Sequence, residues 1–112
     1  EHAISRIDST LILYEGCIGE LNYRIADDPD YQVLKNEKAM FEFLVDILYD
    51  LKTKAQNGEY DYQTILNKLE CVENYFNLKH NTYNLEYVLS EDIFDEYAQR
   101  YAAGEDIESI LG

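Results

Sequence analysis

The chain has 112 residues, 46% of them hydrophobic, which is enough to build the core of one domain over residues 1–112 without a metal ion or a disulfide. Its 23 acidic and 9 basic residues give a formal net charge of -14, which disfavours direct binding to nucleic acids and to anionic membranes. Aromatic residues make up 13% of the chain, which argues against a disordered acidic tail.

Residues 4–25 carry the most regular pattern in the sequence. Apolar side chains recur there at alternating spacings of three and four, which predicts a helix with one buried face: Ile4, Ile7, Leu11, Tyr14, Ile18, Leu21 and Ile25. The opposite side of this helix carries Ile12, Gly16, Gly19 and Tyr23, where each glycine costs about 1 kcal/mol relative to alanine. An internal backbone contact, a kink or a second copy of the chain would each explain these glycines.

A second helix is predicted from Pro29 to about Asn57, with Asp28 as its N-cap and Pro29 at its first position. Lysines in its last turns and Gly58 after it suit a helix C-terminus. Its apolar stripe is wide, which indicates a central helix with several neighbours: Val33, Leu34, Met40, Phe41, Phe43, Leu44, Ile47, Leu48, Leu51 and Ala55.

The third predicted helix starts at the N-cap Asp61 and continues to about Asn77. Its expected inward face consists of six side chains at helical spacing: Tyr62, Ile65, Leu66, Leu69, Val72 and Phe76. A loop rich in asparagine should follow, and we interpret residues 83–89 as a short helix or an extended linker.

A shorter fourth helix should begin after Ser90, because acidic residues at 91 and 92 suit a first helical turn, and should end at Gly104. A final turn over residues 107–111 should fold back onto the other helices. The sequence therefore predicts an all-α fold, an antiparallel helical bundle of three long helices plus a shorter C-terminal fourth helix and a terminal turn.

The sequence shows no recognisable catalytic apparatus. His2 and His80 lie at the terminus and in a polar stretch, without a pattern that pairs either of them with a nucleophile. Glu42, Asp46 and Asp50 recur every four residues on the second helix, as ligands of Mg²⁺ sometimes do, but a solvated face produces the same spacing. We therefore expect a protein that is not an enzyme and that has no catalytic residue, metal site or cofactor.

Half of the net charge falls on the C-terminal third, because residues 81–112 hold eight acidic residues and one basic residue. Tyrosines lie beside these acids, and an acidic surface with aromatic side chains suits a basic protein, since carboxylates steer the encounter and rings supply contact area. The alternative is that the tyrosines are core residues and the acids only solubilise the chain. The predicted partner-binding residues are Tyr87, Glu91, Asp92, Asp95, Glu96, Tyr97 and Tyr101.

The favoured function is that of a small acidic protein that binds a basic protein, such as a nuclease or another nucleic-acid-binding protein, in the manner of an inhibitor, an immunity protein or a nucleic-acid mimic. Two alternatives stay open, a structural or oligomerisation module that forms a homodimer and, more remotely, a Mg²⁺-dependent hydrolase. Cys17 and Cys71 lie within helical patterns, which favours reduced thiols and a cytoplasmic location.

Overall fold

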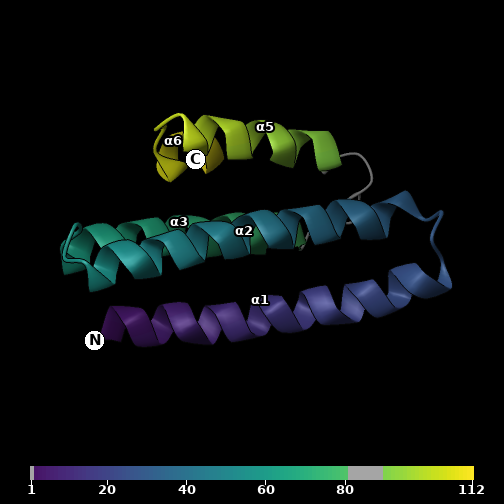
Figure 1. Cartoon of the computed structure of the whole chain (residues 1–112), viewed down its shortest axis with the longest axis horizontal. Coiled ribbons are helices and arrows are strands. Elements are labelled where there is room, and N and C mark those ends of the chain that lie inside the picture. Colours follow the sequence, from purple (N-terminus) through teal and green to yellow (C-terminus); the bar gives the residue numbers. More distant parts are fainter. Residues whose placement is uncertain (1, 81–89) are drawn as a thin grey trace.

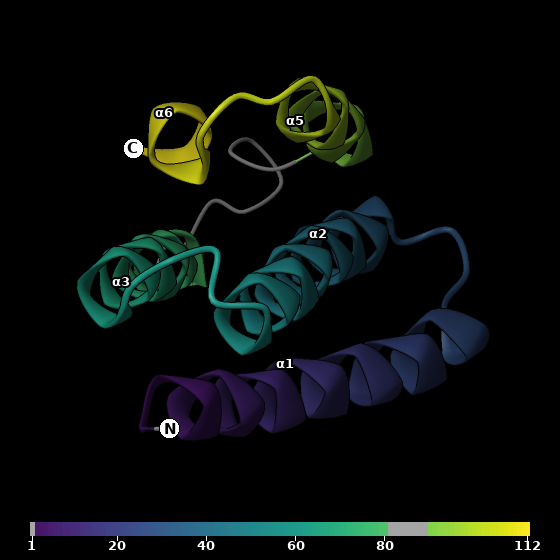
Figure 2. The same ribbon diagram turned by 60° about the vertical axis from the view of Figure 1, so that its left-hand side comes forward.

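The computed structural model describes residues 2–80 and 90–112, which form five helices and no strand: α1 (His2–Asp27), α2 (Gln32–Gln56), α3 (Tyr62–His80), α5 (Glu91–Ala102) and α6 (Ile107–Leu111). Successive long helices run in opposite directions along an axis of 43 Å (Figure 1). Both views place α1 on one side of α2 and α3, and α5 and α6 on the other (Figure 2). The predicted all-α antiparallel bundle, with its shorter C-terminal helix and terminal turn, is confirmed.

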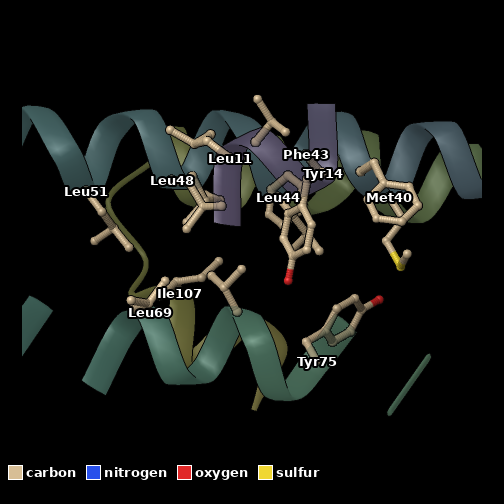
Figure 3. Packing of buried hydrophobic residues seen from close by; sticks show 14 of the residues in the cluster. Leu11, Tyr14, Met40, Phe43, Leu44, Leu48, Leu51, Leu69, Tyr75 and Ile107 are labelled. Carbon is tan, nitrogen blue, oxygen red and sulfur yellow. The ribbon is translucent and has the colours of Figure 1, made fainter. Parts of the chain in front are cut away.

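The second helix is the centre of the bundle, as its wide apolar stripe predicts. α2 packs against α1, α3 and α5, and α6 packs against α3. Leu44, Leu48 and Leu51 of α2 are fully buried and meet core side chains from α1, α3 and α6 (Figure 3). Tyr14 of α1 is also buried, with its ring centroid 5.5 Å from that of Phe41.

The outer side of α1 is not covered by any part of the chain that the structure describes. Gly16 and Gly19 are exposed, and a Cβ added at either position would meet no other side chain or element within 4 Å. Within residues 2–80 and 90–112, nothing makes the internal backbone contact at these glycines that was one of the three explanations expected from the sequence.

The predicted start of the second helix is also wrong. α2 begins at Gln32 with Tyr31 as its N-cap, and the Tyr31 amide donates a hydrogen bond of 3.2 Å to the Asp28 carbonyl oxygen. Residues 28–31 thus form a turn with Pro29 at its second position. The fixed φ of proline suits that position as well as the first position of a helix, so the sequence signal was ambiguous.

The two N-caps predicted at the third and fourth helices are confirmed. The Thr64 amide donates to Asp61 Oδ1 over 2.8 Å, and the Ile93 amide donates to Ser90 Oγ over 3.3 Å. The C-terminal glycines Gly58 and Gly104 have φ values of 72° and 103°, as expected for residues that end a helix in the left-handed region.

The third helix ends later than predicted, and its buried face differs in part from the expected one. It continues through Asn77 to His80, and Tyr62 in its first turn is 53% exposed and does not belong to the core. Tyr75 is buried instead, with its ring edge against Phe94 of α5. The segment 83–89 lies outside the described residues. None of the described helices is both long and apolar enough to cross a bilayer.

Candidate partner-binding surface

Six of the seven predicted binding residues lie on α5, which Ser90 caps and which packs against α2. Its four acidic side chains are all exposed: Glu91, Asp92, Asp95 and Glu96. Glu91 accepts a hydrogen bond of 2.9 Å from Gln32 Nε2 at the start of α2. Tyr87, the first of the seven predicted residues, lies outside the described residues.

The two predicted tyrosines of α5 are half-buried and pack against the core. The Tyr97 ring lies 5.9 Å from Phe43 and 5.8 Å from Phe94, measured between ring centroids. The Tyr101 hydroxyl donates a hydrogen bond to the Asp50 carboxylate, and burial together with this bond raises the pKa of Tyr101. Both tyrosines therefore help to hold α5 on α2 and are only partly exposed for contact with a partner.

A shallow groove of about 150 Å³ lies between α2 and α5, and acidic residues from both helices line it. Glu42 and Asp46 stand on the α2 side and Asp95 stands on the α5 side. Among the residues that the structure describes, none forms an ion pair with these three carboxylates. The groove thus concentrates unpaired negative charge from two separate helices.

The remaining lining of the groove is apolar. It consists of the rings of Phe43 and Phe94, which lie 6.1 Å apart between centroids, and the small side chains of Ala39 and Ala98. A lysine or arginine side chain has an aliphatic stem that can cover such rings and a charge that can reach nearby carboxylates. Since Phe43 and Phe94 are only 5% and 4% exposed, the attraction for the cation comes mainly from the carboxylates. The groove therefore matches a basic side chain better than it matches a purely apolar one.

Most cations of the chain are already neutralised elsewhere. Of the nine lysines and arginines, all within the described ranges, five pair with carboxylates: Arg6, Lys52, Lys54, Lys68 and Arg100. The side chains that line the groove include no lysine, arginine or histidine. Since no positive charge of its own fills it, the groove stays available to a cation from outside.

Nothing in the sequence indicates that Glu42 and Asp46 share a groove with Asp95. Their spacing on α2 marked one face of a helix, but helical periodicity does not tell which other helix lies beside that face. The third member of that series, Asp50, lies apart from the groove because it pairs with Lys54 over 3.1 Å and accepts the Tyr101 hydroxyl. Only a sequence signal that α5 packs on α2 could have predicted that the acidic residues of these two helices lie side by side.

The cysteines and acidic clusters elsewhere form no comparable site. Both cysteines are unbridged, and burial raises the pKa of the Cys17 and Cys71 thiols, which keeps them protonated at neutral pH. Cys71 lines a hollow of about 660 Å³ between α3, α5 and α6, with a mixture of polar and apolar neighbours. Within residues 2–80 and 90–112, no three His, Cys, Asp or Glu side chains are placed to hold a metal ion.

The surface can thus hold cationic side chains, and the part of the chain described offers no comparable cluster for a metal ion. Comparison with protein-family models, with curated proteins and with solved structures found no match for this chain.

Proposed function

We propose that this chain binds a basic protein through the acidic groove between α2 and α5, as an inhibitor, an immunity protein or a nucleic-acid mimic would. The observation that carries the proposal is the convergence of unpaired carboxylates from two helices over an aromatic floor. A nuclease or another nucleic-acid-binding protein is the class of partner that fits, since its basic surface is built to meet a row of negative charges.

The charge distribution supports this proposal in two ways. A net charge of -14 steers a basic partner toward the chain at long range, and the groove supplies the contacts once the partner arrives. The exposed residues Asp92 and Glu96 extend the negative surface along α5 beyond the groove. Long-range steering weakens as salt screens the charges, so association should be strongest at low ionic strength.

The test compares the natural chain with a groove variant, Glu42→Gln, Asp46→Asn and Asp95→Asn combined. A matched control, Asp28→Asn, Asp30→Asn and Glu59→Gln combined, removes the same charge from exposed turns away from the groove. Each immobilised protein is exposed to a lysate at low salt, and captured proteins are eluted with a salt gradient. Affinity for a captured basic protein is then measured at several salt concentrations.

We expect the natural chain and the control to retain the basic partner. The groove variant should lose about tenfold or more in affinity and show a shallower salt dependence, because three charges that contact the partner are gone. Equal binding by the groove variant and the control would refute the groove as the binding site.

A cytoplasmic location is part of the same proposal. The two unbridged cysteines are compatible with a reducing compartment, in which thiols stay free.

A further inference from the structure

The outer face of α1 is an exposed, uncharged stripe that no described part of the chain covers. We define this face by five exposed residues at helical spacings of three and four: Ser9, Ile12, Gly16, Gly19 and Tyr23. Ile12 is 73% exposed and Tyr23 is 78% exposed, so both large side chains are open to contact from outside. The helix α1, which carries this face, lies across the bundle from α5 (Figures 1 and 2).

We propose that this face of α1 binds the same face of a second copy of the chain, in the antiparallel direction. The five residues carry no charge, although 29% of the chain is charged. A basic partner would therefore find no carboxylate on them, whereas another apolar, uncharged face is a suitable complement. Close approach of two helices would also explain glycines at sites where an alanine would meet nothing within the chain.

The order of the residues makes the face complementary to itself when two copies run antiparallel. If the two helices cross at Gly16, each Ile12 lies opposite Gly19 of the second copy. Each Tyr23 then lies opposite Ser9 of the second copy. Every large side chain thus meets a small one, which is the arrangement that lets helices interdigitate without voids.

The charges beside the face favour the same direction. In the antiparallel register, Arg6 of each copy lies near Asp27 of the other, and the twofold symmetry forms this pair twice. The Arg6 side chain is 46% exposed, even though it also pairs with Glu73. The antiparallel register brings the two Glu15 side chains together once, whereas a parallel arrangement would place Glu15 of each copy near Glu20 of the other and form such a like-charged pair twice.

The first part of the test is the oligomeric state. Sedimentation equilibrium of the natural chain at about 0.15 M salt, where repulsion between the acidic copies is screened, should show a monomer–dimer equilibrium. Because one helix face is a small interface, the dimer should be weak and should depend on concentration. A chain that stays monomeric up to a concentration of about 1 mM would overturn the proposal and leave the face to another protein.

The second part is mutational. Ile12→Glu and Gly16→Ala should each weaken dimerisation by about tenfold or more. The glutamate places a charge in the interface between the two copies, and the alanine blocks the close approach of the two helices. Asn22→Glu adds a charge on the same helix outside the face and should leave the dimer unchanged. Circular dichroism of each variant checks that the helices are retained. A dimer that survives Ile12→Glu in a folded chain would overturn the proposal.

The direction is tested by exchange of charges. Arg6→Glu and Asp27→Arg should each weaken the homodimer, since each places like charges together. An equimolar mixture of the two variants should form a heterodimer with restored affinity, because both pairs are then of opposite sign. Failure of the mixture to associate better than either variant alone would overturn the antiparallel register. None of these substitutions lies in the groove, so their outcome is independent of the basic partner.

Discussion

The tyrosines within the described residues include buried and exposed side chains with different roles. Tyr14 and Tyr75 are buried, and Tyr101 is half-buried with its hydroxyl donated to Asp50. Tyr23 is 78% exposed on the outer face of α1. Sequence composition cannot separate the groups, because a tyrosine has an apolar ring that suits a core and a hydroxyl that suits a surface. Burial separates them, and it also determines how they respond to alkaline pH.

The unfolding free energy should fall as the pH rises above about 10. Burial raises the pKa of Tyr14, Tyr75 and Tyr101 above the ordinary value of 10.0, and for Tyr101 the hydrogen bond to Asp50 adds to this. Above pH 10 the unfolded chain therefore loses these protons first, and the stability that is fully present at lower pH is lost. Each tyrosine can contribute up to about 1.4 kcal/mol per pH unit, and less where its side chain is partly solvated.

Urea denaturation at intervals between pH 8 and pH 11 measures this effect. Tyr75→Phe removes one of the titrating hydroxyls and should reduce the slope above pH 10. A free energy of unfolding that stays constant up to pH 11 would contradict the prediction.

At the scale of single helices, the termini follow from local chemistry. Gly58 and Gly104 each close a helix with two backbone bonds, from the glycine amide and from the amide after it, to carbonyls of the last turn. Their positive φ values explain why glycine is required there. Gly16 is different, because it lies inside α1 with helical neighbours and open space around it.

Alanine substitutions should therefore have opposite effects at these glycines. Gly16→Ala should stabilise the monomer by about 1 kcal/mol, because alanine is the better helix former and its Cβ meets no obstacle. Gly58→Ala and Gly104→Ala should each destabilise the fold by about 1 kcal/mol, because alanine is strained at positive φ. Chemical denaturation at low protein concentration measures all three without a contribution from dimerisation. Destabilisation by Gly16→Ala would show that this glycine has a structural role within the chain.

Much of the fold was predictable because helix faces and caps are local signals. Spacing correctly predicts the buried stripe of α1 that contains Leu11 and Tyr14. Residue type correctly predicts the caps Asp61 and Ser90 and the glycines that end two helices. The start of α2 was not, because Pro29 suits two different local structures. The groove was not predictable either, since it depends on which face of α5 lies beside α2, and this is set by packing between residues far apart in sequence.

At the scale of the whole molecule, the two proposed surfaces lie on opposite sides of the bundle. α1 forms one outer layer and α5 contributes to the other, with α2 between them (Figure 2). A dimer formed through α1 would leave both acidic grooves free and facing away from each other. Two grooves in one assembly would raise the apparent affinity for a partner that is itself dimeric or bound to a surface, without any new contact.

The same charges that serve binding should weaken the isolated fold. Glu42, Asp46 and Asp95 share a groove without an ion pair to any described residue, in a chain of net charge -14, so they repel one another and the rest of the molecule. The groove variant Glu42→Gln, Asp46→Asn and Asp95→Asn should therefore have a higher Tm than the natural chain. The gain should shrink as salt rises, because the Debye length falls from about 30 Å at 0.01 M to about 8 Å at 0.15 M.

Thermal unfolding of both proteins across this salt range measures the effect. The control variant at 28, 30 and 59 loses the same net charge from exposed turns, so any extra gain of the groove variant reports on repulsion within the groove itself. A lower Tm for the groove variant, or a gain that salt does not reduce, would mean that these carboxylates stabilise the fold through contacts of another kind. A higher Tm together with lost partner binding would show that the chain retains the three carboxylates for recognition at a cost in stability.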